Sequence, residues 1–356
     1  MNKDIYISKS NINIVDAMAK IDEGGYGILY IVDESEKLIG SVSDGDVRRW
    51  IIESNDITVN VKKIMNSKPK YIFEKEQEKA DYLKNKYLIN SLPILDCERK
   101  IVDIIFFDKD ITVKTKNNIK GKLNVPVIIM AGGKGTRLYP YTKILPKPLI
   151  PIGDTPIIER IINKFTESGS NKFYITVNYK KNMIKSYFNE IEHSYSITYV
   201  EEDIPLGTGG SIKLIKDKFE LPVIVTNCDA LIIANYEDVY EYHKKSGNIV
   251  TMVSALKNIT IPYGVLNTKE NGELVSIDEK PKLSYFVNTG MYIINPEIID
   301  MIPDRKLFHM THLVQLVKDK GGKVGVYPVS EDSFLDMGEF DEMHRMEEKL
   351  NILSDR

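Results

Sequence analysis

The strongest constraint on the fold is an apolar run that passes directly into a glycine turn. Val125–Met130 (VPVIIM) has the continuous apolar character of a buried strand, and Ala131–Leu138 (AGGKGTRL) follows without a break. Similar apolar runs at Lys172–Val177 and Leu221–Thr226 alternate with the helical pattern of Ile157–Phe165. This alternation predicts an α/β domain with a mainly parallel, Rossmann-like sheet that helices cover on both faces.

Polar residues follow two of these strands at their carboxyl ends, where open α/β sheets bind ligands. The glycines of the turn let the backbone approach a phosphate closely, and Lys134 and Arg137 add positive charge. Asp229 follows the strand at Leu221–Thr226 after two intervening residues. The turn matches neither the dinucleotide pattern nor a Walker A loop. Taken alone, a glycine turn after a strand is more often structural than functional.

A lysine near the turn strengthens the functional interpretation. Lys147 lies ten residues after Arg137, between Pro146 and Pro148, which restrict the backbone and exclude a regular helix or strand. A rigidly held lysine beside a phosphate loop suits a reaction that accumulates negative charge. A solvated loop lysine would not explain its enclosure by two prolines.

A weak internal repeat of roughly 60 residues occupies the N-terminal part of the chain. Each copy has a helix-like segment followed by two short β-rich runs around a polar turn. Such a repeat predicts a unit that pairs with its neighbour and buries a shared face. The helical segments are Ile14–Ile21, Asp44–Glu53 and Glu76–Leu88, and the strands are Gly27–Val32, Leu38–Val42, Ile94–Leu95 and Ile101–Phe107.

This repeat resembles a CBS pair, or Bateman module, in VDESEKLIGSVSDGDVRR and LPILDCERKIVDIIF. The resemblance implies an α+β domain with a site for an adenosine-type nucleotide, in which a Ser or Thr and an Asp follow the second strand. Gly40, Ser43 and Asp46 match that arrangement in the first copy, whereas Phe106 and Lys109 occupy it in the second. We therefore expect at most one such site, with Ser43 and Asp46 as its ligand residues. A purely packing or dimerising module is the alternative.

The second domain resembles the sugar-1-phosphate nucleotidyltransferases. Their pattern AGGxGTRLxPxT, then PKPL, then a proline before the first long helix, is matched by AGGKGTRLYPYTKILPKPLIPIGDTPII. The resemblance implies a GT-A-like fold and the transfer of a nucleoside monophosphate to a sugar 1-phosphate with release of pyrophosphate. Further matching segments are PLGTGG (205–210), NCDA (227–230), PYGV (262–265), DEKP (278–281), FVNTG (286–290) and FLDMG (334–338).

The resemblance also implies a role for each matched residue. Arg137 and Lys147 would be the catalytic residues, on the nucleotide phosphates and the reacting phosphates. Asp229 and Asp336 would bind Mg²⁺, which usually combines one or two carboxylates with waters and substrate phosphates. Cys228 replaces the glycine of many relatives and narrows the space beside the nucleotide. The nucleotide-binding residues would be Gly132, Gly133, Gly135, Thr136, Gly207 and Thr208, and the sugar-phosphate-binding residues Gly264, Glu279, Lys280, Asn288 and Thr289.

The choice of nucleotide turns on Glu202, in YVEEDIPLGTGG, where related uridylyl and thymidylyl enzymes usually have glutamine. A carboxylate can accept hydrogen bonds from the N1–H and 2-amino groups of guanine, so we predict GTP. A CBS pair joined to a transferase also resembles the amino-sugar guanylyltransferases of bacterial nonulosonic (legionaminic) acid pathways. This implies glucosamine 1-phosphate or a related sugar as acceptor, and a nucleotide sugar for cell-surface glycans as product. A uridylyl- or thymidylyltransferase and a non-catalytic sensor of sugar nucleotides are the alternatives.

Composition argues against several other classes of protein. A net charge of −3 and a pI near 6.1 argue against nucleic acid as a partner. No stretch approaches the roughly 18 apolar residues of a membrane span, and the N-terminus has no apolar signal core. Cys97 and Cys228 predict neither a disulfide nor a zinc site. We expect a cytoplasmic homo-oligomer with a CBS module at 1–114, a polar linker at 115–124 and the transferase domain at 125–356.

Overall fold

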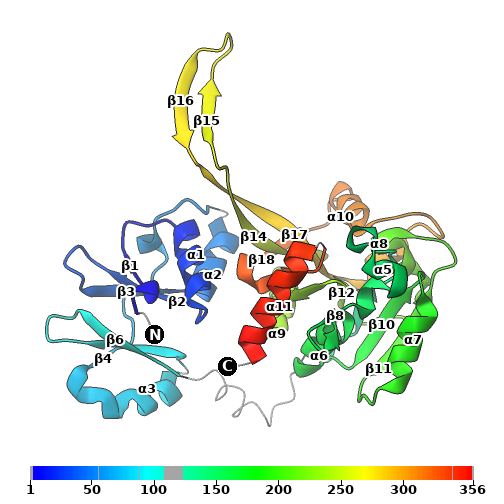
Figure 1. Cartoon of the computed structure of the whole chain (residues 1–356), viewed down its shortest axis with the longest axis horizontal. Helices are drawn as coiled ribbons and strands as arrows, with labels where there is room; N and C mark the ends of the chain where they lie inside the picture. Colours follow the sequence, from blue (N-terminus) through cyan, green and yellow to red (C-terminus); the bar gives the residue numbers. More distant parts are fainter. Residues whose placement is uncertain (1–2, 55, 88, 108–122, 339, 355–356) are drawn as a thin grey trace. The chain divides into compact units, whose positions relative to one another are not determined.

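The computed structural model describes residues 3–54, 56–87, 89–107, 123–338 and 340–354 (Figure 1). Most of the predicted linker at 115–124, and Lys109, lie outside these residues. The chain divides into two units, and the segment that contains PYGV and DEKP groups with the first. The first unit is Met1–Asn118, Leu256–Tyr285 and Ser330–Asp332, and the second is Ile119–Ala255, Phe286–Val329 and Ser333–Arg356.

The N-terminal part of the first unit contains two similar three-stranded sheets. In each, the first two strands pair in parallel and the second pair is antiparallel. This confirms the predicted repeat. The elements are β1 (Ile7–Lys9), α1 (Ile14–Gly24), β2 (Ile28–Val32), β3 (Leu38–Ser43), α2 (Asp44–Ser54), β4 (Ile72–Phe73), α3 (Ala80–Tyr87), β5 (Ser91–Leu95) and β6 (Ile101–Phe106).

The two copies share one apolar core, as the repeat predicted. Tyr30 and Leu38 of the first copy pack with Leu95 and Ile104 of the second. The helix predicted from Glu76 begins instead as a 3₁₀ turn at Glu74–Lys79 and becomes α-helical at Ala80. The reason is local, because Glu76 has φ −116° and ψ 20°, outside the α-helical range.

A seven-stranded sheet forms the centre of the second part of the chain, in the order β11-β10-β7-β12-β17-β14-β18 (Figure 1). The pairs β11–β10, β10–β7 and β7–β12 are parallel, and β12–β17 is antiparallel. The predicted α/β fold with a mainly parallel mixed sheet is therefore confirmed. Its strands are β7 (Val127–Met130), β10 (Lys172–Val177), β11 (Ser196–Glu201), β12 (Val223–Asn227), β14 (Val250–Thr260), β17 (Lys282–Ile294) and β18 (Val324–Ser330).

Helices cover this sheet through apolar faces with helical spacing. In α6, five side chains at or near successive turns are buried: Ile157, Ile158, Ile161, Ile162 and Phe165. Burying one such side chain stabilises the fold by about 1.5–3 kcal/mol. The helices of this part are α5 (Tyr141–Ile144), α6 (Ile157–Glu167), α7 (Lys181–Glu190), α8 (Gly207–Gly210), α9 (Tyr236–Lys245), α10 (Met310–Asp319) and α11 (Phe340–Ser354).

Three small two-stranded sheets complete the described chain. The sheet of β13 (Ala230–Ile232) and β19 (Phe334–Asp336) joins two segments about a hundred residues apart and pairs Ala230 with Asp336. The others are β8 (Pro151–Ile152) with β9 (Thr155–Pro156), and the exposed hairpin of β15 (Gly264–Thr268) and β16 (Leu274–Glu279).

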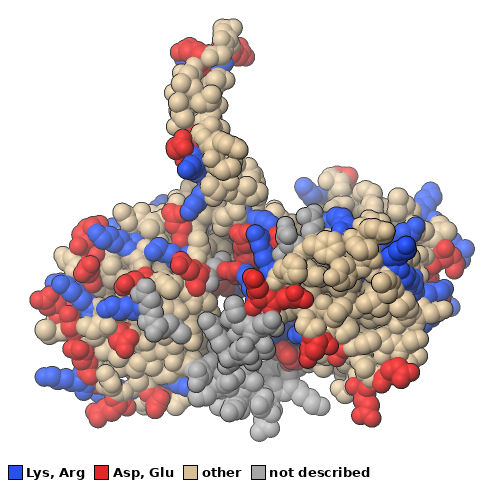
Figure 2. Space-filling model, viewed as in Figure 1, with Lys and Arg blue, Asp and Glu red and all other residues tan. Residues whose placement is uncertain are grey.

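Charged side chains of both signs are intermingled on the face of the molecule in Figure 2. This distribution agrees with the small net charge of −3. Among the helices that the structure describes, none has the length and apolar character needed to cross a bilayer.

Candidate active site

A cavity of about 520 Å³ lies where β7 and β12 end. Its wall also includes Met130, Thr176, Pro205, Asn227 and Cys228, which the sequence did not single out as ligand residues. The structure brings together in this wall ten residues that the sequence placed in the nucleotide, catalytic or metal groups: Gly132, Gly133, Gly135, Thr136, Arg137, Lys147, Glu202, Gly207, Thr208 and Asp229.

The turn after β7 needs a glycine because a carboxylate lies against it. A Cβ atom on Gly132 would lie only 2.4 Å from Oε1 of Glu202, much closer than two such atoms can approach. Glu202 is 5% exposed, and its Oε2 accepts a hydrogen bond from the backbone N–H of Leu206 at 3.0 Å. The turn and the loop that follows β11 are therefore held at a fixed separation across the cavity.

Burial raises the pKa of the Glu202 carboxyl, and the hydrogen bond from the Leu206 N–H opposes that rise. The side chain thus supports the loop and also lines the cavity. A hydrogen bond donated by a ligand stabilises a buried carboxylate more than it stabilises an exposed one.

Lys147 is buried at the edge of the same cavity. It begins a single 3₁₀ turn, Lys147–Leu149, with Pro146 before it and Pro148 within it. A one-turn 3₁₀ helix is compatible with these prolines, so the prediction of no regular α-helix or strand agrees with the structure. The Lys147 ammonium forms an ion pair with the carboxylate of Asp229, although the two residues are 82 positions apart.

The small sheet β13–β19 brings the two predicted metal ligands together. Asp336 is the last residue of β19, and the N–H of Met337 donates to the carbonyl oxygen of Asp229 at 2.8 Å. Burial raises the pKa of Asp336, and the neighbouring charge of Asp229 raises it further. The charges of Lys147 and Arg137 lower this pKa, so both cations interact electrostatically with the Asp336 carboxylate.

This pair of carboxylates fits a hard divalent cation. Within the described residues no group of three or more His, Cys, Asp or Glu side chains could hold a metal on its own. Two carboxylates with substrate phosphates and water are, however, the usual ligand set of Mg²⁺.

Cys228 lies beside this pair and is buried. Burial, and then the charge of Asp229, raises the pKa of its thiol. The thiol therefore stays protonated near neutral pH.

Two cavity residues come from a part of the chain in which no motif was recognised. Leu307 and His309 line the cavity just before α10. The segment is held by backbone hydrogen bonds, since the N–H groups of Gly209 and Gly210 both donate to the Phe308 carbonyl at 2.9 Å. Such contacts use only backbone atoms and leave no pattern of residue types.

The predicted sugar-phosphate residues fall into two groups. Gly264 and Glu279 are register partners in the hairpin, and Lys280 follows with a positive φ of 46°. Asn288 and Thr289 lie on β17, where the Asn288 amide donates to the Tyr292 hydroxyl at 2.6 Å and Thr289 Oγ1 donates to the Val253 carbonyl at 2.7 Å. Their assignment to one sugar-phosphate site remains a prediction.

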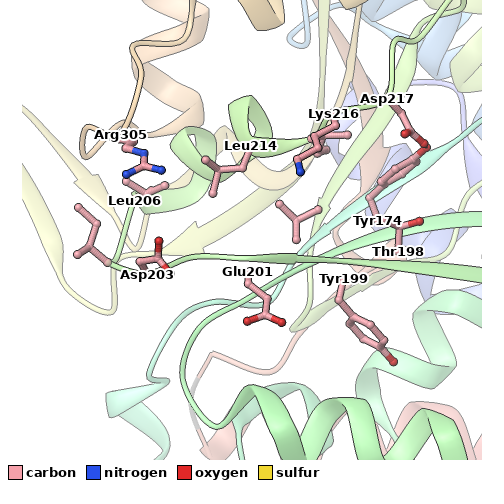
Figure 3. Close-up of a pocket in the computed structure, with 13 residues that line it drawn as sticks. Tyr174, Thr198, Tyr199, Glu201, Asp203, Leu206, Leu214, Lys216, Asp217 and Arg305 are labelled. Atoms are coloured by element: carbon pink, nitrogen blue, oxygen red, sulfur yellow. The ribbon is translucent and has the colours of Figure 1, made fainter.

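A second cavity, of about 570 Å³, is lined by residues of β11 and of the loop that follows it (Figure 3). It contains none of the predicted site residues. Two of its acidic side chains have ion-pair partners, because Glu201 pairs with Lys181 and Lys185, and Asp217 pairs with Lys172. Of these two cavities, only the smaller one is lined by the predicted nucleotide-binding residues.

The first unit has a cavity of about 280 Å³ whose wall includes Ser43 and Asp46. Asp46 Oδ2 accepts hydrogen bonds from the Ser43 N–H at 2.9 Å and the Ser43 hydroxyl at 2.6 Å, so it also supports the start of α2. In the second copy, Phe106 packs its ring against Tyr26 with centroids 4.2 Å apart. An aromatic side chain packed in this way cannot accept hydrogen bonds from a ribose.

The α/β fold and the site at the ends of β7 and β12 together define a nucleotidyl transferase. The Nucleotidyl transferase family model matches residues 126–351, more than half of the chain, and the chain belongs to this family. The CBS domain model matches residues 1–53, which covers the first copy of the repeat.

The chain is similar to two kinds of sugar-phosphate enzyme. It is 34% identical over 184 residues to the mannose-1-phosphate guanyltransferase of Debaryomyces hansenii, covering 49% of this chain and 51% of the relative. It is 33% identical over 195 residues to the UTP–glucose-1-phosphate uridylyltransferase of Synechocystis sp., covering 49% and 50%. The chain thus spans about half the length of these curated relatives. The crystal structure of HddC from Yersinia pseudotuberculosis aligns over 64% of this chain and 99% of its own, at 25% identity and a TM-score of 0.49.

Proposed function

We propose that this protein transfers GMP from GTP to a sugar 1-phosphate and releases pyrophosphate. The observation that carries the proposal is the meeting of Asp229 and Asp336 beside Lys147, where Asp229 and Lys147 line the same cavity as the glycine turn. The family membership of residues 126–351 supports the same class of reaction.

The reaction requires that the two substrates are aligned and that their negative charge is compensated, and it requires no general base. An oxygen of the sugar phosphate, already ionised near neutral pH, attacks the α-phosphorus of the nucleotide, and pyrophosphate leaves. The main barrier is the repulsion between two anions that must align. Lys147 and Arg137 provide fixed positive charge at the cavity, and the glycine turn offers backbone N–H groups to phosphate oxygens. Mg²⁺ held by Asp229 and Asp336 would supply further neutralisation and a template for the phosphates.

Glu202 supports guanine as the base. Its carboxylate is buried in the cavity wall and can accept from two adjacent donors. The curated relatives include both guanyl- and uridylyltransferases, so a uridylyl- or thymidylyltransferase is the alternative within the family. Glucosamine 1-phosphate or a related amino sugar is our proposed acceptor, on the sequence resemblance stated above. Two cysteines without a disulfide agree with a cytoplasmic enzyme.

A substrate matrix tests this proposal directly. Pyrophosphate release is measured with Mg²⁺ for GTP, UTP, dTTP and CTP against glucosamine 1-phosphate, glucose 1-phosphate and mannose 1-phosphate. We expect turnover with GTP, and its loss in the variant Asp229→Asn/Asp336→Asn. Binding of a nucleotide sugar without pyrophosphate release from any pair would favour the non-catalytic sensor. A strong preference for another nucleotide would refute the assignment of GTP.

For the first unit we propose an adenine nucleotide in the cavity that Ser43 and Asp46 line, and self-association of the chain through its CBS pair. The support is one cavity beside the motif-matching residues of the first copy, together with the CBS family match to residues 1–53. Binding of ATP, ADP and AMP by the full chain, and its mass in solution, test these two points separately.

A further inference from the structure

The segment that contains His309 is hydrogen-bonded at several points to the loop that contains Leu206 and Thr208. The Phe308 N–H donates to the Leu206 carbonyl at 2.8 Å, and the Met310 N–H donates to the Thr208 hydroxyl at 3.1 Å. These bonds and the two to the Phe308 carbonyl hold the His309 backbone against a loop that lines the cavity. A side chain on so fixed a backbone is suited to selecting a ligand.

The imidazole ring has a defined orientation against this loop. Its Nδ1 accepts a hydrogen bond from the Thr208 N–H at 3.4 Å. A Cβ atom on Gly207 would lie 2.9 Å from Nδ1 and 3.0 Å from Cε1, so only a glycine leaves room for the ring. His312 supports it from α10, because its Nδ1 accepts from the His309 N–H at 3.2 Å and the two rings are 5.2 Å apart.

These contacts assign the hydrogen-bonding roles of the ring. A neutral imidazole has one donor and one acceptor nitrogen. Since Nδ1 accepts from Thr208, the proton lies on Nε2, which then acts as a donor. His309 lines the cavity and is only partly buried, so this donor is available to a ligand.

Glu202 provides the complementary group on the same loop. Its Oε2 holds the N–H of Leu206, while His309 holds the N–H of Thr208. Two residues of backbone span at most about 7 Å, so these anchor points lie close together along the wall. The cavity therefore presents an imidazole donor and a carboxylate acceptor that contact backbone N–H groups two residues apart on one loop.

We propose that His309 Nε2–H donates to the keto oxygen of the nucleobase while Glu202 accepts from the ring N–H beside it. Guanine offers O6 next to N1–H, and uracil offers O4 next to N3–H. Adenine and cytosine present the reverse order, an amino donor beside a ring acceptor, and would leave both protein groups without partners. His309 thus selects keto bases over amino bases. This role rests on the nucleotide site of the proposed function.

The test compares His309→Leu, which removes the donor, with His309→Gln, whose amide nitrogen can reach the position of Nε2. Loss of one such hydrogen bond should raise KM for GTP about tenfold with little change in kcat, and should lower the GTP-to-ATP preference about tenfold. The GTP-to-UTP preference should stay unchanged, because both bases are keto bases. His309→Gln should recover most of the loss. His344→Leu, an exposed histidine on α11, is the matched control and should behave as wild type.

Binding measured by calorimetry with GTP and ATP separates this inference from the proposed function. If no sugar phosphate supports pyrophosphate release but His309→Leu still loses its preference for GTP over ATP, the inference stands and the proposed reaction fails. If pyrophosphate is released and the GTP-to-ATP ratio of His309→Leu equals that of wild type, the inference is overturned. Thermal unfolding checks each variant, and His309→Asn, which is too short to reach the base, replaces the leucine variant if that protein does not fold.

Discussion

Replacing Lys147 with methionine should destabilise the protein in a way that Mg²⁺ corrects. The Lys147 and Asp229 side chains are only 10% and 16% exposed, and Asp336 lies in the field of both. Lys147 and Arg137 are the two cations that lower the pKa of Asp336. Without the Lys147 ammonium group, only Arg137 of these two remains near the two carboxylates. Breaking a buried ion pair from one side costs about 3–5 kcal/mol. Because some water reaches this pair, we expect about 3 kcal/mol.

The assay is thermal unfolding with and without millimolar Mg²⁺. For a domain of about 150–250 residues, 1 kcal/mol corresponds to about 2–4 °C, so Lys147→Met should lower the apparent Tm by about 6–12 °C without metal. Mg²⁺ should recover a large part of this loss, since a divalent cation replaces the missing charge. The control is Lys213→Met, because Lys213 pairs with Asp300 at the surface, where the carboxylate is 91% exposed. Removing an exposed pair should cost less than about 1 kcal/mol and show no Mg²⁺ response.

A double variant makes the reasoning refutable. Lys147→Met/Asp229→Asn removes both charges of the ion pair, so it should be more stable than Lys147→Met without metal and should respond weakly to Mg²⁺. Two results would refute this reasoning: Lys147→Met has the same Tm as wild type in the absence of metal, or the double variant has a lower Tm than Lys147→Met. In either case Lys147 does not compensate the charge of the two aspartates.

Three further predictions follow from other parts of the chain. Glu202→Gln should lower the preference for GTP over UTP about 10- to 100-fold and raise the melting temperature, because burial raises the pKa of this carboxyl; unchanged kinetics would contradict the base assignment. Burial lowers the pKa of His243 below its ordinary 6.5, so the unfolded chain takes up the proton first and the unfolding free energy should fall as the pH drops below about 6.5. His243→Gln should lose that dependence in melting curves, and equal pH slopes would count against it. Asp46→Ala should weaken ATP or AMP binding about tenfold by calorimetry, with Asp81→Ala on α3 as the control; equal affinities would leave Asp46 a structural residue.

The strands of the central sheet could be predicted closely because burial on both faces leaves a continuous apolar run. Lys172–Val177 is β10 with the predicted bounds. The run at Leu221 begins as a strand only at Val223, since Pro222 cannot donate to the ladder. The second copy of the repeat was harder to delimit. The strand predicted at Ile94–Leu95 begins three residues earlier in the structure, since β5 starts at Ser91 and pairs on both sides.

The site could be predicted only where its residues lie in local motifs. The glycine turn and Lys147 follow strand and proline patterns, so residue types alone marked them. The meeting of Asp229 and Asp336 depends on the β13–β19 ladder, which spans about a hundred residues and has only three residue pairs. No periodicity reports so short a pairing, and the family resemblance was needed to suggest it. His309 had neither a motif nor a resemblance, because the bonds that join the Phe308 backbone to the loop at 206–210 use main-chain atoms that any sequence provides.

In the nucleotide site that we propose, the contact between Gly132 and Glu202 explains how the phosphate-binding turn and the base-selecting residue can change independently. The carboxylate approaches the turn so closely that position 132 must lack a Cβ atom. A glutamine has nearly the same size and shape as a glutamate, and its carbonyl oxygen can still accept from the Leu206 N–H. Exchange of the two therefore leaves the space beside Gly132 unchanged while it replaces an acceptor with a donor facing the base. A family with this arrangement can alter its nucleotide preference at one position and keep the same glycine turn for the phosphates.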